Sequence, residues 1–173
     1  MTSEQEQPKS ERILSEIKLH KEHRKVADVD EPVLKIVIFS LSGESYAFAG
    51  ASVLEILPVD EISPIPGTPS CILGLIVLRG DIESVVDLRW ILGLSRGADD
   101  EGIVLLATSG TVRSGILIEE VEDVVDVPRR SILTAPSNLD AGVREFVAGQ
   151  LEYGGKNVTL LDLEKIFARV EAS

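Results

Sequence analysis

Two histidines and their acidic neighbours are the first residues whose types could do chemistry. His20 and His23 lie three positions apart, close to Glu16 and Glu22, and these residue types bind metal ions in other proteins. The segment around them is rich in Glu, Lys, Gln and Ser and has few apolar residues. We therefore interpret the histidines as part of a solvated, charged segment, and we expect no metal ion and no other cofactor.

Two aspartates, Asp87 and Asp162, could form a pair of carboxylates for acid–base chemistry. Each precedes a short run with helical spacing, however, where a carboxylate caps the first free N–H groups of a helix. Nucleophilic catalysis would require a base near a serine or cysteine, and both histidines lie elsewhere. The sequence also lacks the G-x-x-x-x-G-K-[ST] phosphate loop. We expect a protein without catalytic residues.

The two aspartates belong to a pattern that occurs twice. Residues 74–92 and 149–167 align without a gap, 75 positions apart. Each copy has an apolar run, a turn with glycine, a second apolar run and a short helix that begins after the aspartate. The chain is therefore predicted to contain an internal duplication.

The turn of the first copy carries Arg79 and Gly80, whereas the second copy has Gly154 and Gly155. A primed hairpin turn requires a positive φ at its first central residue, which is unfavourable for arginine. A type II turn accepts arginine there, and the sequence leaves both geometries open. In either case Arg79 lies at a loop tip, where a guanidinium is a good anchor for a partner carboxylate.

The strand before this turn is apolar on both faces in the first copy only. Leu75 and Val77 stand where the second copy has Gln150 and Glu152. A strand of this kind needs a cover on its second face, either the other half of the molecule or another protein.

Composition limits the classes of partner. The net charge of -12 disfavours nucleic acids and anionic lipid surfaces. The single cysteine, Cys71, excludes an internal disulfide, and the sequence has no apolar run of about 18 residues. We therefore expect a cytoplasmic protein that does not insert into a membrane.

The elements predict an all-β fold with short helices. β-Branched residues and turns at short intervals suggest about five strands in each half of the chain, and a small barrel removes the exposed edges of such a sheet. We expect a flexible or weakly helical extension over 1–33, then one domain over 34–173. Its barrels would span about 34–95 and 102–162, with a C-terminal helix over 163–170. Thr68 and Pro69 further predict a short helix that ends at Gly74.

An ordered set of motifs resembles the CheW-like family of bacterial chemotaxis coupling proteins. The resemblance covers about residues 34 to 170. Its main segments are Pro66-Gly67-Thr68-Pro69, Gly74-Leu75-Ile76-Val77-Leu78-Arg79-Gly80 and Val85-Val86-Asp87-Leu88-Arg89. Two departures are Val77, where the family usually has asparagine, and Glu83-Ser84, where it usually has an apolar residue and proline.

The resemblance implies two five-stranded SH3-like barrels and an adaptor without catalysis. It would bind the regulatory domain of a CheA-type histidine kinase and the cytoplasmic tip of methyl-accepting chemoreceptors, in receptor arrays at the inner face of the membrane. The alternative is a detached regulatory module that modulates or competes for a kinase, for example in a motility pathway. The partner-binding residues would be Arg79, Gly80, Val53, Glu55, Leu75 and Val77.

Overall fold

The β-branched runs of the sequence form ten strands in the part of the chain that the structure describes. The computed structural model describes residues 31–59, 61–95 and 102–173, so the extension predicted for 1–33, with both histidines, lies almost wholly outside the described residues. The strands are β1 (Val33–Leu41), β2 (Glu44–Ala49), β3 (Val53–Pro58), β4 (Ile72–Leu78), β5 (Asp81–Asp87), β6 (Ile103–Ser109), β7 (Val112–Ile118), β8 (Glu120–Pro128), β9 (Val147–Tyr153) and β10 (Lys156–Leu161).

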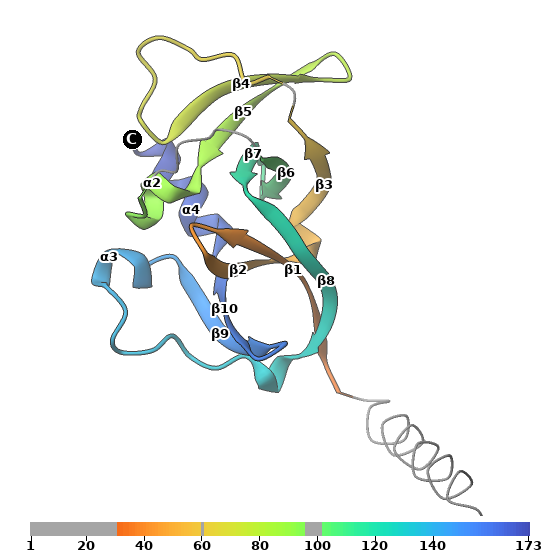
Figure 1. The fold of residues 1–173 in the computed structure, drawn as a ribbon. Helices are drawn as coiled ribbons and strands as arrows, with labels where there is room; N and C mark the ends of the chain where they lie inside the picture. Colours follow the sequence, from red (N-terminus) through yellow and green to blue (C-terminus); the bar gives the residue numbers. More distant parts are fainter. Residues whose placement is uncertain (1–30, 60, 96–101) are drawn as a thin grey trace, which may run out of the picture. The chain divides into compact units, whose positions relative to one another are not determined.

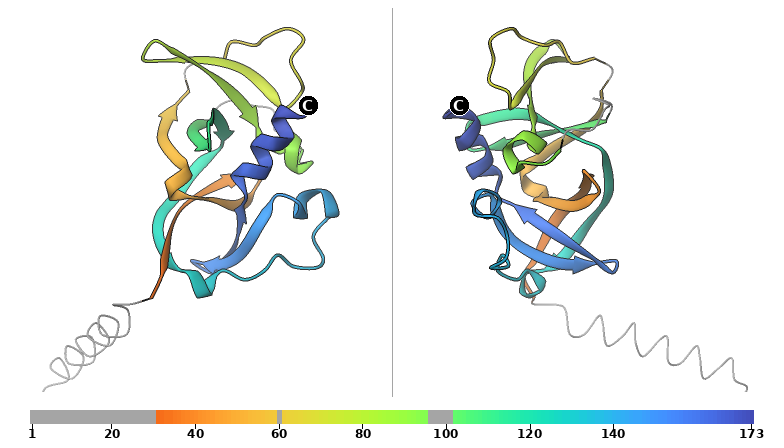
Figure 2. Two further views of the ribbon diagram at one scale, coloured as in Figure 1. Left: turned by 180° about the vertical axis from the view of Figure 1, so that it is seen from behind. Right: turned by 60° about the vertical axis from the view of Figure 1, so that its left-hand side comes forward.

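The helices are short, as expected. They are α2 (Leu88–Leu92), α3 (Ala141–Arg144) and α4 (Leu163–Glu171), with single 3-10 turns η1 (Gly50–Ser52) and η2 (Arg129–Ser131). Figure 2 shows α4 leading from the end of β10 towards β5. The predicted C-terminal helix over 163–170 is confirmed to within one residue.

The strands assemble into two five-stranded sheets (Figure 1). Sheet A has the order β8-β1-β2-β10-β9, and sheet B has the order β3-β6-β7-β5-β4. The predicted all-β class with two five-stranded units is confirmed. Within the described residues, however, the two end strands of each sheet do not pair with each other, so neither sheet closes into a hydrogen-bonded barrel.

Each sheet takes strands from both halves of the chain. Sheet A contains β1 and β2 from the first half with β8, β9 and β10 from the second, and sheet B contains the remaining five strands. The predicted ranges 34–95 and 102–162 therefore do not describe the two sheets. The cause is the parallel pairing of β2 with β10 and of β5 with β7, which joins strands that are remote in sequence.

The two sheets follow one plan. Both have the same order of elements, in which a hairpin from one repeat is completed by three strands from the other. β4 and β9 are 75 positions apart, as are the beginnings of α2 and α4, in agreement with the predicted duplication.

The hydrophobic core has three parts. The largest lies between the sheets and includes Phe39, Phe48, Leu105 and Ile116, together with apolar residues of α2 and α4. The interior of sheet A holds seven buried residues: Ile36, Ile38, Ala47, Val127, Leu151, Val158 and Leu160. The interior of sheet B holds three: Val85, Val104 and Leu117. Sheet B is therefore the more thinly packed unit.

The aspartates at the ends of β5 and β10 cap the helices that follow. A side-chain oxygen of Asp87 accepts the backbone N–H of Arg89 at 3.0 Å, and Asp162 accepts that of Lys165 at 3.2 Å. Gly93 ends α2 in the left-handed conformation, with φ 66°. The capping role predicted for both residues is confirmed.

The short helix predicted at Thr68 and Pro69 is wrong. The chain forms a turn there, and β4 begins at Ile72. The hydroxyl of Thr68 donates to the carbonyl oxygen of Ile65 at 2.9 Å instead of accepting an N–H group further along the chain. A threonine that bonds backwards in this way stabilises a turn and does not start a helix.

Candidate protein-interaction surface

The turn between β4 and β5 has a fixed and unusual geometry. Arg79 has a φ of 52° and Gly80 a φ of 91°, so both central residues are left-handed. This pattern defines a primed hairpin turn and excludes type II, in which the first central residue has a negative φ. The turn therefore places an arginine at a position that glycine occupies in the second copy.

Arg79 reaches from this turn to β3. Its Nη2 lies 2.5 Å from Oε1 of Glu55, and the Arg79 side chain remains 75% exposed while that of Glu55 is 26% exposed. The structure thus brings together two of the residues predicted to bind partners, 24 positions apart in sequence. Exposed ion pairs contribute about 0–1 kcal/mol to stability, so this contact orients the guanidinium more than it stabilises the fold.

Sheet A has a corresponding contact between its end strands. The hydroxyl of Tyr153 on β9 donates to Oδ2 of Asp123 on β8 at 2.5 Å. This hydrogen bond raises the pKa of Tyr153 above its ordinary value, and burial and the Asp123 charge add to the effect. In each open sheet, therefore, one side-chain contact to a carboxylate on an end strand links the two ends, through tyrosine in sheet A and through arginine in sheet B.

The predicted apolar residues differ in exposure. Val77 is 75% exposed, the largest exposure among the large hydrophobic residues that the structure describes. Leu75 is less exposed: it is half-buried, and its backbone pairs with Ser63 through two hydrogen bonds of 2.9 Å. Val53 packs against the core between the sheets. Of the three, only Val77 has a side chain that is mostly exposed.

Three exposed apolar residues of β3 and the β4–β5 hairpin were not among the predicted binding residues: Ile82, Leu54 and Ile56, which are 66%, 52% and 42% exposed. Ile82 lies directly opposite Val77 in the hairpin. Leu54 and Ile56 alternate with the inward-facing residues of β3. The exposure of Ile82 follows from the hairpin register once the turn residues are known. The exposure of Leu54 and Ile56 follows from the period of two along a strand once the inward face of β3 is known.

A hollow of about 450 Å³ lies along β4. It is lined by Leu57, Pro58, Val59, Glu61, Ser63, Leu75, Ile76, Val77 and Leu78. Most of these residues are apolar, and Val77 continues the lining to the exposed tip of the hairpin. We define the hairpin tip surface as Val77, Arg79 and Ile82 with Glu55.

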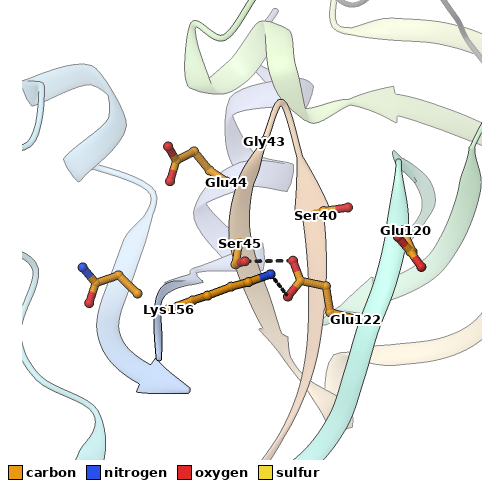
Figure 3. A pocket seen from close by; sticks show the side chains of 8 residues that line it. Ser40, Gly43, Glu44, Ser45, Glu120, Glu122 and Lys156 are labelled. Atoms are coloured by element: carbon orange, nitrogen blue, oxygen red, sulfur yellow. Dashed lines mark hydrogen bonds and ion pairs between the residues drawn. The ribbon is translucent and has the colours of Figure 1, made fainter. Parts of the chain in front are cut away.

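A second hollow, of about 430 Å³, lies on sheet A (Figure 3). Its lining is polar, and Glu122 accepts a hydrogen bond from Ser45 at 2.8 Å and pairs with Lys156 at 3.4 Å. These groups satisfy one another, and no histidine or cysteine lines the hollow.

Asp87, a candidate for acid–base chemistry in the sequence, takes part in a buried ion pair. Asp87 is buried and its Oδ1 lies 3.1 Å from Nε of Arg89, which is also buried. Within residues 31–59, 61–95 and 102–173, no group of three or more His, Cys, Asp or Glu residues could hold a metal ion. No helix in the same ranges is long and apolar enough to cross a membrane.

Comparisons with known proteins agree with these observations. The family model described as the CheW-like domain matches residues 35–171. A protein named chemotaxis protein CheW from Klebsiella aerogenes is 30% identical over 139 residues, which is 79% of this chain and 83% of the relative. FrzA from Myxococcus xanthus is 26% identical over 148 residues, which is 83% of this chain and 91% of the relative.

A solved structure has the same fold. The scaffolding protein TtCheW from Thermoanaerobacter tengcongensis superimposes with a TM-score of 0.69 at 28% identity, and the match covers 79% of this chain and 88% of that one. The family match spans all ten strands apart from the first residues of β1. The chain therefore belongs to the CheW-like domain family, the chemotaxis coupling adaptors.

Proposed function

We propose that the protein couples chemoreceptors to a CheA-type histidine kinase as an adaptor that performs no reaction of its own. The observation that carries the proposal is the hairpin tip surface, where an exposed guanidinium, oriented by Glu55, lies beside exposed apolar residues. In a chain of the CheW-like family, a surface with this composition has the properties of a protein-binding hot spot.

Arginine suits this role because its planar donors pair with a partner carboxylate in a defined geometry. The contact with Glu55 engages Nη2, and a guanidinium has further N–H donors for a partner. The left-handed turn fixes the backbone from which the side chain extends, so little backbone conformational entropy is lost on binding.

The proposed partners are the regulatory domain of the kinase and the cytoplasmic tip of methyl-accepting receptors. Relatives named chemotaxis protein CheW and a relative named a scaffolding protein support this pairing. An adaptor with two partners gains strength from multivalency, because each bound partner raises the effective concentration of the next. Its place of action would be the receptor array.

The test is the substitution Arg79→Ala. We expect at least a tenfold loss of affinity for the receptor tip or the kinase regulatory domain, the size expected when a hot-spot arginine is truncated. The melting temperature should change little, because alanine retains the same backbone and the lost ion pair is exposed. Titration calorimetry with each purified partner, together with thermal unfolding, measures both quantities.

A matched control is Lys35→Ala. Lys35 also makes an exposed ion pair, with Asp126 at 3.6 Å, but on sheet A and away from the hairpin tip surface. Its removal should leave both affinities unchanged. If Arg79→Ala binds both partners as tightly as the unmodified protein, or if it unfolds the chain, the proposed role of this surface is wrong.

A further inference from the structure

β4 has an outer edge that is only half paired. β4 is the last strand of sheet B, and the N–H and C=O groups of Leu75 point away from β5 to bond with Ser63. Backbone groups in a strand point the same way at every second residue, so those of Val77 also point outwards. On the side away from β5, no strand among residues 31–59, 61–95 and 102–173 pairs with β4 at Val77.

The side chains at this edge are apolar. Val77 and Ile82 face each other in the hairpin, and Leu78 pairs with Asp81 next to the turn. The Leu78–Asp81 pair is hydrogen-bonded in a two-residue hairpin, so Val77 and Ile82 form the next, non-hydrogen-bonded pair, in which side chains lie closest. Their exposures of 75% and 66% leave one continuous apolar patch beside unpaired backbone groups.

The second copy of the hairpin shows that the fold does not require this patch. The positions that correspond to Val77 and Ile82 are Glu152 and Asn157, which pair in the same register and are exposed. A charged residue on an edge strand discourages pairing with another chain. The chain therefore protects the edge of sheet A and leaves the edge of sheet B open.

Opposite charges lie on either side of the open edge. Arg79 is exposed at the turn that ends β4, and Glu61 is exposed on the wall of the hollow that runs along β4. A segment that paired with β4 at Val77 would therefore lie between a cation and an anion. Charge complementarity therefore favours a partner segment that has an aliphatic residue at Val77, an acidic side chain near Arg79 and a basic side chain near Glu61.

We propose that an extended segment of the kinase regulatory domain adds a strand to sheet B at Val77, with an aliphatic side chain packed on Val77 and Ile82. This inference rests on the proposed function and assigns the open edge to one of its two partners. A receptor helix bundle does not suit this edge, because its backbone groups are already bonded within each helix. Strand addition is a common mode of peptide recognition, in which main-chain bonds give affinity and alternate side chains give specificity.

The experiment transfers the edge of the second copy to the first, in the double variant Val77→Glu with Ile82→Asn. We expect at least a tenfold loss of affinity for the purified kinase regulatory domain, with the affinity for the receptor tip and the melting temperature unchanged. The control is Leu133→Glu, which changes an equally exposed residue, 66%, beside β9 in sheet A. It should leave both affinities intact.

Amide hydrogen exchange of the unmodified protein tests the mode of binding. The N–H group of Val77 should exchange more slowly in the kinase complex than in the free protein, because the added strand accepts its hydrogen bond. An exchange rate that is unchanged in the kinase complex would overturn strand addition.

Other results would also overturn the inference. If the double variant loses receptor binding but retains kinase binding, the edge belongs to the receptor. If sedimentation shows a dimer that the double variant abolishes while kinase binding is intact, the occupant is a second copy of the chain. If Arg79→Ala weakens binding and the double variant does not, the inference fails while the proposed function stands.

Discussion

At the scale of single residues, Glu83 departs from the apolar core of sheet B. Glu83 is buried, and its counterpart in the second copy is Val158, a core residue of sheet A. Its Oε1 forms an ion pair with Arg113 of β7 without a well-directed hydrogen bond. Arg113 also approaches Asp81 at 3.7 Å. The fold tolerates this carboxylate because a cation from the neighbouring strand reaches it.

The first prediction is that Arg113→Ala destabilises the protein by about 3 kcal/mol, since it leaves a buried carboxylate without its counter-charge. Urea unfolding measures the change in the free energy of unfolding. Adding Glu83→Val, which copies Val158, should recover most of the loss. If the single variant is as stable as the unmodified protein, the ion pair does not support the core of sheet B.

The second prediction concerns pH. The hydrogen bond from Tyr153 to Asp123 raises the pKa of Tyr153, so the contact contributes stability below the ordinary tyrosine pKa of 10.0. That contribution is lost as the pH rises through the folded-state value. Asp123→Ala should therefore lower the pKa of Tyr153, as followed by ultraviolet absorbance during an alkaline titration.

The titration needs a background with Tyr46→Phe. Burial raises the pKa of Tyr46, and the Glu44 charge adds to this effect, so its signal would overlap that of Tyr153. In this background only one tyrosine titrates, since the sequence contains two. An unchanged midpoint after Asp123→Ala would show that the hydrogen bond does not control the ionisation of Tyr153.

At the scale of elements, the hairpin-plus-helix units are predictable from sequence because their signals are local. Turn glycines and the capping aspartates Asp87 and Asp162 act within a few residues, and the structure confirms both units. Thr68 and Pro69 give an equally local signal that is misleading, since the threonine hydroxyl bonds backwards to Ile65. A capping residue predicts a helix only when a helical run follows it.

Gly74 shows how one residue positions a neighbouring segment. It has a φ of 153°, and a Cβ at this position would lie 2.2 Å from the carbonyl oxygen of Ser63. The register of β4 and β5 also shifts between Ile72 and Gly74. A Cβ at the corresponding Gly149 would lie 2.8 Å from the carbonyl oxygen of Leu133. Both glycines let an outer segment approach an edge strand.

The third prediction is that Gly74→Ala separates Ser63 from β4 and costs more than 2 kcal/mol, because backbone must move and a left-handed φ is strained. Gly110→Ala is the control. Gly110 also has a positive φ, of 59°, but nothing lies within 4 Å of the added methyl group, so only the conformational cost of about 1 kcal/mol remains. Equal losses in the two variants would exclude the steric argument.

At the scale of the whole molecule, the exchange of strands between repeats could not be predicted from sequence. Periodicity identifies strands such as β2 and β10, but their parallel pairing involves only three residue pairs and leaves no local signal. The same limit applies to the site. The loop position of Arg79 follows from its neighbours, whereas its contact with Glu55 depends on how β3 and the hairpin meet.

The fourth prediction follows from the exchange of strands. Fragments 33–95 and 102–173 should each be unfolded alone, because each holds only part of both five-stranded sheets. Mixed together, they should recover the circular dichroism spectrum and the cooperative unfolding of the intact chain. A fragment that folds cooperatively as a monomer would contradict the observed strand order.

The reciprocal completion of the two sheets also bears on how such a chain could arise. In each sheet, one repeat gives a hairpin and the other gives three strands, so two separate copies of a single repeat could make the same contacts as an intertwined homodimer. Joining their genes in tandem would turn that dimer into a monomer without any new interface. After the fusion, the two copies could diverge in sequence. One hairpin could then keep a protected edge while the other acquired Val77, Arg79 and Ile82.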